Sequence, residues 1–253
     1  MSEPDSRTPE LTSPDTGASG EAPEVLDEVP VAAPLTMNQA RRPLLLSLGA
    51  VLLAVLAGFG GYLIGKPSFP DDGSADAGFA RDMQAHHAQA VDMSLIIRSH
   101  TSATDVTTLA YDIATSQENQ RGQLRGWLVT WKLSQARSGQ PMDWMKNTGH
   151  NHPGTVPGTM LMPDGRMPGL ATAAEMRQLQ ALRGKPAEIL YLQLMIIHHR
   201  SGVKMAQACV DVCREPDVVD LAKTMVSGQQ SEIQLMTDYL TKRGAQPLPD
   251  PTR

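Results

Sequence analysis

The sequence predicts an all-α protein in which two duplicated helical hairpins form a four-helix bundle behind a single transmembrane helix. Three observations support this. An apolar run without charge covers residues 43–65, a pattern of Met, His and apolar residues recurs at a constant offset of 112 residues, and β-strand signals are nearly absent. The 253 residues are enough for one domain of ordinary size with appendages.

Residues 1–42 form an acidic segment rich in Pro, Ser and Thr. We expect it to be disordered, because it has no apolar period and too little hydrophobic surface to offset chain entropy. Its eight acidic and three basic residues account for the whole net charge of −5, so that residues 43–253 balance at 19 acidic and 19 basic side chains. Nucleic-acid binding is excluded for lack of a positive field.

The apolar run at 43–65 is long enough to cross a hydrocarbon core of about 30 Å as a helix. It has no polar face, which disfavours a buried core helix. A cleaved signal peptide is disfavoured because 42 residues precede the run and because it exceeds the usual apolar length of such peptides. Arg41 and Arg42 precede the run and Lys66 alone follows it. The positive-inside rule therefore places the tail in the cytoplasm and everything after Lys66 outside, beginning with a linker over residues 66–74.

An internal repeat is the strongest signal in the chain. The segments FARDMQAHHAQAVDM, from Phe79, and YLQLMIIHHRSGVKM, from Tyr191, share the pattern M-x2-H-H-x5-M. The same offset relates six further pairs: Leu109 and Leu221, Ala110 and Ala222, Gln117 and Gln229, Leu124 and Met236, Trp127 and Tyr239, and Leu128 and Leu240. The duplicated units are residues 75–136 and 187–242.

In each unit the spacing of apolar residues is compatible with a 3.6-residue period and predicts two helices. The expected helices are 75–100, 104–136, 187–213 and 217–242. Two such hairpins pack most simply as one four-helix bundle within residues 75–243, followed by a tail at 244–253. The segment 137–186 is long enough to cross the bundle, as in ferritin-like topologies, and contains a short amphipathic helix within 171–184.

The repeated motif places its two Met and two His side chains on one face of a helix, around a small residue, Ala90 or Gly202. If the first helices of the two units approach each other, eight candidate metal ligands converge. They are Met83, His86, His87, Met93, Met195, His198, His199 and Met205.

Thioether and neutral imidazole ligands suit Cu(I). A di-iron centre is disfavoured because Asp82 and Asp92 become Leu194 and Lys204, so that no carboxylate is duplicated. Structural zinc is disfavoured because Met is a poor zinc ligand. The alternative is that Met fills the core and the His pairs are satisfied, but packing alone does not require a His pair in both units.

Gln117 and Gln120 correspond to Gln229 and Glu232 on the second helices. These polar side chains are expected either to hydrogen-bond the far ring nitrogens of the histidines or to lie on a solvated face.

The crossover is rich in Met and His: Met142, Met145, His150, His152, Met160, Met162 and Met167. It either gathers Cu(I) or is a disordered loop of biased composition, and we favour the loop.

Cys209 and Cys213 stand four residues apart at the end of the third expected helix. Outside the cytoplasm a disulfide is favoured for such a pair, although it requires the last helical turn to distort. Thiolates acting as further Cu(I) ligands are the alternative.

The repeated motif, the helix that follows it, and the segment MPGLATAAEM at 167–176 resemble the domain-of-unknown-function 305 family over residues 75–241. The resemblance implies a ferritin-like four-helix bundle exported from the cytoplasm, with a role in copper binding and tolerance and with the eight Met and His residues as ligands. Gln120-Arg121 departs from the usual pattern, which Glu232-Ile233 keeps, so the two second helices are not expected to have identical roles.

We therefore expect a membrane-anchored extracytoplasmic protein that sequesters or relays Cu(I), and a homodimer is left open. A ferritin-like oxidoreductase with a redox metal is the first alternative, disfavoured because the repeated face offers no duplicated carboxylate for acid–base chemistry. An interaction module that signals through the acidic tail is the second alternative. No nucleophilic triad or phosphate-binding loop is present, which excludes hydrolase and nucleotide-binding functions.

Overall fold

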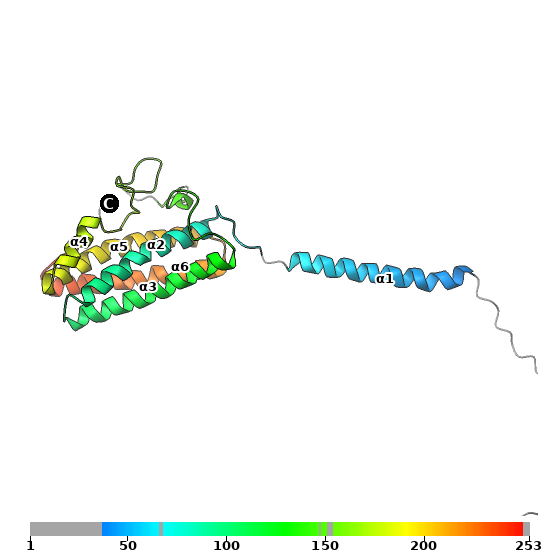
Figure 1. Ribbon diagram of the computed structural model, residues 1–253, viewed down its shortest axis with the longest axis horizontal. Helices are drawn as coiled ribbons and strands as arrows, with labels where there is room; N and C mark the ends of the chain where they lie inside the picture. The colour runs from blue at the N-terminus through cyan, green and yellow to red at the C-terminus, as the bar shows by residue number, and fades with distance from the viewer. Residues whose placement is uncertain (1–36, 66–67, 147, 151–153, 250–253) are drawn as a thin grey trace, which may run out of the picture. The chain divides into compact units, whose positions relative to one another are not determined.

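The computed structural model describes residues 37–65, 68–146, 148–150 and 154–249. Within these ranges every regular element is helical, which confirms the all-α prediction. The elements are α1 (Met37–Ile64), α2 (Ala75–Arg98), α3 (Thr104–Thr130), the 3-10 turn η1 (Asp143–Met145), α4 (Ala173–Ala181), α5 (Gly184–Val212) and α6 (Pro216–Lys242), as Figure 1 shows. The expectation of disorder for residues 1–42 is wrong for residues 37–42, because α1 extends over them ahead of the apolar run. Residues 1–36 and the candidate His152 of the crossover lie outside the described residues.

The chain divides into two units between Lys66 and Pro67. In the first unit α1 begins at Met37, before the apolar run, and carries Pro43 within its N-terminal part. Among the described residues it is the one helix that is long and apolar enough, from Arg41 to Ile64, to cross a membrane. Its length and composition fit either a membrane anchor or a signal sequence.

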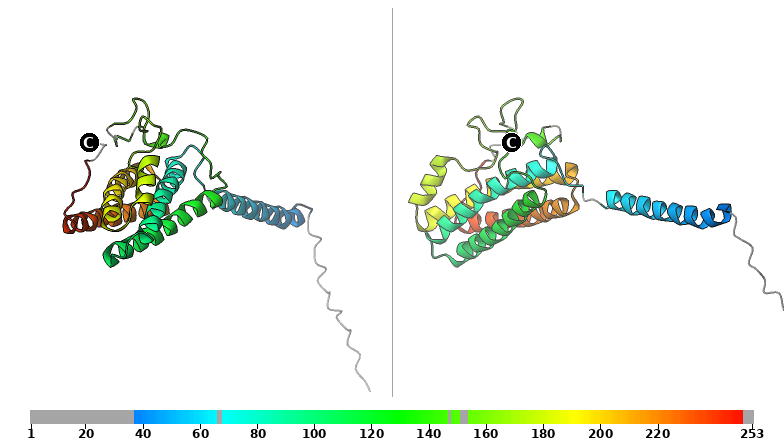
Figure 2. Two further views of the ribbon diagram at one scale, coloured as in Figure 1. Left: turned by 60° about the vertical axis from the view of Figure 1, so that its left-hand side comes forward. Right: turned by 45° about the vertical axis from the view of Figure 1, so that its right-hand side comes forward.

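In the second unit four long helices lie side by side (Figures 1 and 2). Helix α2 packs on α3 and α5 packs on α6, and the two hairpins meet along α2 and α5. These two helices are antiparallel: the carboxylate of Asp76 accepts hydrogen bonds from the backbone N–H groups of Arg214 (3.0 Å) and Glu215 (2.9 Å). At the opposite end the N–H of Gly184 donates to the carbonyl of His100 (2.8 Å). Helices α3 and α6 contact each other only sparsely.

Residues that favour helix N-termini stand at the start of several of these helices. The Ser74 hydroxyl accepts a hydrogen bond from the N–H of Ala77 and caps α2. Thr172 and Glu175 form a reciprocal capping box at the start of α4. Pro216 occupies the first turn of α6. A backbone N–H there would have no acceptor within the helix, so the proline, which has none, costs no hydrogen bond.

Three long helices lie within a few residues of their predicted ranges, but α3 ends at Thr130 and the prediction that it continues to residue 136 is wrong. Lys132 adopts a left-handed conformation (φ 60°). The N–H of Leu133 then donates to the carbonyl of Leu128 (2.8 Å) and that of Lys132 to Val129 (3.0 Å). This is a Schellman-type helix end. It was not recognisable beforehand because no glycine or asparagine stands at the left-handed position.

The crossover covers one side of the α2–α5 pair. Gln89 on α2 exchanges hydrogen bonds with the backbone N–H (2.6 Å) and carbonyl (2.9 Å) of Ala171. Ser201 on α5 donates to the carbonyl of Pro168 (2.6 Å). Gln89 and Ser201 stand at equivalent positions of the two repeats, so the crossover uses the same place on both helices. Helices α3 and α6 pack on the other side.

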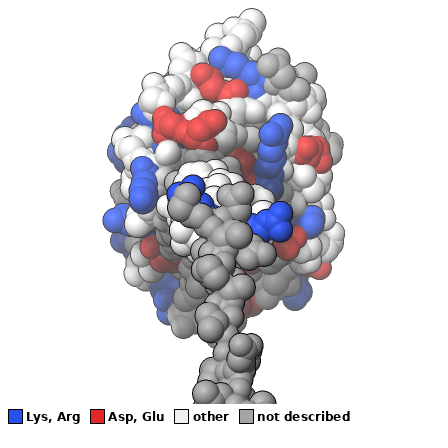
Figure 3. All heavy atoms as spheres, turned by 90° about the vertical axis from the view of Figure 1, so that its right-hand side faces the viewer, with Lys and Arg blue, Asp and Glu red and all other residues white. Residues whose placement is uncertain are grey.

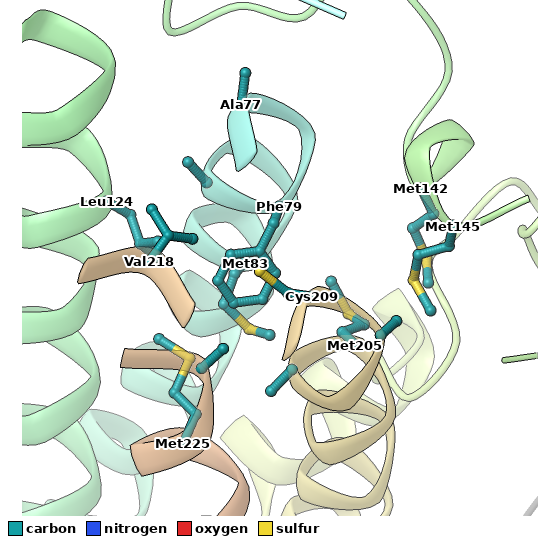
Figure 4. Close-up of a cluster of buried hydrophobic side chains, with 14 of the residues drawn as sticks. Ala77, Phe79, Met83, Leu124, Met142, Met145, Met205, Cys209, Val218 and Met225 are labelled. Atoms are coloured by element: carbon teal, nitrogen blue, oxygen red, sulfur yellow. The ribbon is translucent and has the colours of Figure 1, made fainter. Parts of the chain in front are cut away.

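Buried side chains form two clusters, one at each end of the α2–α5 contact. The cluster around Phe79 is rich in sulfur, and Figure 4 shows several of its methionines. They are Met83, Met142, Met145, Met160, Met167, Met205 and Met225. Four of these belong to the crossover. The expectation of a disordered crossover loop is therefore wrong for these methionines, because their flexible side chains fill the core under the segment.

Cys209 and Cys213 form a disulfide with a Cα–Cα distance of 4.9 Å, which confirms the favoured expectation. Helix α5 ends at Val212, and Cys213 already has an extended backbone conformation (ψ 155°). The bond is thus accommodated by ending the helix, and the thiolate alternative does not apply to this oxidised pair.

Candidate metal centre

Helices α2 and α5 bring the four histidines of the two motifs together. His86, His87, His198 and His199 are all at most 1% exposed. The rings of His86 and His198 face each other with centroids 3.7 Å apart and an interplanar angle of 33°. Because these residues occupy equivalent positions on antiparallel helices, the midpoint of the repeat symmetry lies between them.

The second helix of each repeat orients one histidine. Nε2 of His87 lies 2.7 Å from Oε1 of Gln120, and Nε2 of His199 lies 2.7 Å from Oε2 of Glu232. Both partners are acceptor oxygens, so each Nε2 carries the proton and the lone pair of a neutral ring stands on Nδ1. Of the two alternatives expected for Gln120 and Glu232, hydrogen bonding to the far ring nitrogens is the one that the structure shows.

The Nδ1 atoms are the unexplained part of this arrangement. Nε2 of His198 donates to the backbone carbonyl of His86 (2.9 Å), so its lone pair also stands on Nδ1. Within the described ranges, the Nδ1 atoms of His87, His198 and His199 are buried and have no hydrogen-bond partner. A buried acceptor left unpaired destabilises a fold by about 1–3 kcal/mol. Three such atoms in one core make this place a candidate ligand site.

Burial also sets the charge of the rings. Loss of solvation lowers the pKa of His87 to about 3, against a weaker opposing effect of the Gln120 hydrogen bond. The same loss lowers the pKa of His198 well below its ordinary value. Both imidazoles are therefore neutral at physiological pH, which is the form that binds metals.

The four methionines of the two motifs are fully buried but do not lie in one place. Met83 and Met205 belong to the sulfur-rich cluster at one end, and Met93 and Met195 belong to the cluster at the other end. The antiparallel crossing explains this, because it sets the start of one motif beside the end of the other. The four imidazoles thus occupy the middle, with a pair of thioethers on each side along the helices.

This donor set fits a soft monovalent cation. Among the described side chains no group of three or more His, Cys, Asp or Glu is arranged to hold a metal ion. The donors that the two motifs do provide are buried imidazoles and thioethers, and a mixed set of this kind suits Cu(I). Zinc and di-iron carboxylate centres do not fit the same residues.

Two glutamines complete the buried polar set. Gln117 and Gln229 are 2% and 4% exposed, and neither their amide nitrogens nor their oxygens have a hydrogen-bond partner in the described part of the chain. A Cβ at Gly202 would lie 2.4 Å from Oε1 of Gln229, so the glycine makes room for this amide. The sequence indicated both glutamines by their shared repeat position, but both alternatives expected for them are wrong, because they neither bond histidines nor lie on a solvated face.

Asp82 is a buried carboxylate that the sequence did not single out. It accepts hydrogen bonds from the N–H of Met142 (2.6 Å) and from Nε1 of Trp144 (3.0 Å), and it pairs with Arg137. Burial raises the pKa of Asp82, and Arg137 opposes the shift. The residue ties the crossover to α2 beside Met83. The available signal was that the second repeat has Leu194 at this position.

A family model described as Domain of unknown function (DUF305) matches residues 76–240. A solved structure of a DUF305 protein from Streptomyces coelicolor, described as secreted, is 49% identical, covers 71% of this chain and 99% of its own, and superimposes with a TM-score of 0.63. A DUF305 fragment from Deinococcus radiodurans is 28% identical, covers 70% and 99%, and has a TM-score of 0.53.

CopM, in a form described as Cu(I)-bound, is 19% identical, covers 66% of this chain and 96% of its own, and has a TM-score of 0.49. A likeness this distant carries no weight for the ligand of this chain. No curated protein sequence matches the chain.

Proposed function

This chain belongs to the DUF305 family, and we propose on that premise that it is a membrane-anchored extracytoplasmic protein that binds Cu(I) and sequesters or relays it. The proposed ligands come from the eight motif residues. The imidazoles bind through Nδ1, and the thioether pairs Met83 with Met205 and Met93 with Met195 complete the coordination from either side.

One observation carries the proposal. The Nδ1 atoms of His87, His198 and His199 are buried and lack hydrogen-bond partners in the described part of the chain, and those of His87 and His198 bear lone pairs because their rings are neutral and each Nε2 faces an acceptor. Cu(I) accepts neutral nitrogen and sulfur ligands in a dry site, since it brings a single charge and needs no carboxylate. Binding would therefore remove the penalty of the unpaired acceptors.

The architecture that we propose around this site is a ferritin-like four-helix bundle of α2, α3, α5 and α6, with the crossover as its long connection. Helix α1 is proposed as the membrane anchor. Arg41 and Arg42 before it support a cytoplasmic N-terminus and an extracytoplasmic helical unit.

The test is anaerobic titration of the full chain, purified in detergent, with Cu(I) against a competing chromogenic chelator. We expect saturable binding that disappears in a variant with His86, His87, His198 and His199 all replaced by alanine. Because four alanines in the core can disturb folding, a His87→Leu/His199→Leu variant keeps volume and removes two Nδ1 ligands. It should weaken Cu(I) binding by at least tenfold with unchanged helical circular dichroism.

The matched control is His100→Ala/His150→Ala, which removes two histidines outside the motifs. His100 and His150 are only half-buried and bond Leu179 and Asp211 respectively. This control should bind Cu(I) like the wild-type chain. Cu(I) binding of equal strength in the quadruple variant would refute the proposal and leave the Met–His faces as packing.

A further inference from the structure

A polar cleft separates the middle parts of α3 and α6. Its volume is about 220 Å³, and Ser116, Gln117 and Gln120 line it from α3, whereas Gly228, Gln229 and Glu232 line it from α6. Gln120 and Glu232 are the side chains that hold His87 and His199. The cleft therefore ends directly on the acceptors of the histidine rings.

The cleft is continuous with solvent. An outer groove of about 520 Å³ shares Ser116, Gln120 and Thr224 with it. The opposite side of the α2–α5 pair is covered, because the crossover bonds Gln89 and Ser201 there. A path from water thus runs between α3 and α6 as far as Gln120 and Glu232, the side chains that hold His87 and His199.

The floor of the cleft holds the two unpartnered glutamines. Gln117 and Gln229 come from different helices, stand at equivalent repeat positions and are at least nine-tenths buried. Buried amides are almost always hydrogen-bonded in folded proteins, so two unpaired amides facing one cleft call for a polar ligand. Amide carbonyl oxygens can replace water around a cation.

We propose that this cleft is the entrance through which a hydrated metal cation reaches the four histidines, and that the amide oxygens of Gln117 and Gln229 are its first protein ligands. The inference rests on the proposed function, because the entrance serves the same site. Glu232 on the cleft wall and Asp112 in the outer groove supply negative charge that attracts a cation. The positive charge of Arg121, on α3, is paired with the carboxylate of Glu118.

Gly228 allows the entrance to be closed without touching a metal ligand. A Cβ at Gly228 meets nothing within 4 Å, so a leucine can extend into the cleft without disturbing α6. Gly122 is the matched control, since it is also exposed, helical and free of neighbours around its Cβ, on α3. Both substitutions replace a helical glycine and raise helix propensity equally.

The measurement uses the full chain in detergent, with Cu(I) as the probe. The rate of uptake is followed by quenching with an excess of chromogenic chelator, and the rate of release is followed by adding the chelator to loaded protein. For Gly228→Leu we expect both rates to fall at least tenfold with Kd unchanged within twofold. Gly122→Leu should match the wild-type chain in all three quantities.

Each other outcome decides the question. Equal rates in Gly228→Leu and Gly122→Leu overturn the entrance, while the proposed function stands because Cu(I) is still bound. A tenfold change in Kd at unchanged uptake rate assigns the cleft to the binding site itself and also overturns the entrance. Absence of Cu(I) binding in the wild-type chain removes the proposed function, and the entrance with it.

A second variant tests the amides. Gln117→Leu/Gln229→Leu replaces both amides by apolar groups of similar size, so the protein without metal should become more stable and its Tm should rise by several degrees. Uptake of Cu(I) should slow several-fold. Uptake at the wild-type rate would show that the amides are not ligands on the path.

Discussion

His86 and His198 lie face to face at the crossing of α2 and α5, with ring centroids 3.7 Å apart, although 112 residues separate them in the chain. Each is the first histidine of the repeated motif, His86 in the first copy and His198 in the second. Their contact places the symmetry axis of the duplication inside the candidate metal centre. An ion bound by His87 and His199 together would contact both halves of the duplication and hold them together.

The acceptors behind the two outer histidines are expected to tune affinity differently, because Glu232 is a carboxylate and Gln120 is neutral. Glu232→Gln keeps an acceptor for Nε2 of His199 but loses the charge, whereas Glu232→Ala loses both. Cu(I) affinity should fall in the order wild type, Glu232→Gln, Glu232→Ala, by about 10–100-fold in the last. Competition titration with a chelator measures this order. Equal affinities would indicate that His199 is not a ligand.

The Cys209–Cys213 disulfide should support stability and not metal binding. The cysteines stand four residues apart, and closing so short a loop contributes about 2 kcal/mol in chain-entropy terms. Cys209→Ser/Cys213→Ser should therefore lower the free energy of unfolding by about this amount. Denaturant unfolding and Cu(I) titration of the oxidised chain and the variant test both parts. A lower Cu(I) stoichiometry in the variant would contradict the structural role.

Gly169 should be the most sensitive glycine of the crossover. Its φ is +82°, and a Cβ there would lie 2.3 Å from Cβ of Ser201. Gly169→Ala combines backbone strain with overpacking against α5 and should destabilise the protein by about 3 kcal/mol. Gly165 has the same φ but nothing within 4 Å, so Gly165→Ala should destabilise it by only about 1 kcal/mol. Thermal unfolding measures the loss of stability in each variant. An equal loss in Gly169→Ala and Gly165→Ala would show that Ser201 moves away from the added methyl group.

The pair of Asp105 and Arg243 predicts an acid-dependent contribution to stability. Two hydrogen bonds from Arg243 (3.0 and 2.9 Å) hold the pKa of Asp105 below its ordinary value. The unfolded chain therefore binds the proton more tightly, so the stabilisation is present above about pH 4 and is lost as the pH falls through the lowered pKa. The difference in unfolding free energy between wild type and Asp105→Asn should accordingly shrink between about pH 6 and pH 2. A difference that stays constant over this range would contradict the ion pair.

Charge on the surface matches the expected absence of a positive field. Lys, Arg, Asp and Glu side chains are interspersed over the face that Figure 3 draws. The residues that follow position 42 include 19 acidic and 19 basic side chains. The polarity that matters for the proposed function is therefore local to the cleft and to the histidine core.

The repeat, read from the sequence alone, determined the four long helices and the face that carries the Met and His residues, and it offered the pairing of Gln120 and Glu232 with histidines as one of two alternatives. These features follow from local periodicity and from one constant offset, because side chains three or four residues apart share a helix face wherever the helix lies. The apolar run likewise determined that α1 is a helix able to span a membrane.

Tertiary structure alone decided which of those residues meet. The antiparallel crossing of α2 and α5 brings His86 to His198 but separates Met83 from Met195 into opposite clusters, and no periodicity encodes a distance between helices. The crossing also leaves the amides of Gln117 and Gln229 beneath a cleft that α3 and α6 do not close. Burial without partners depends on how whole helices pack, and it is this packing that turns a repeated motif into a candidate metal centre.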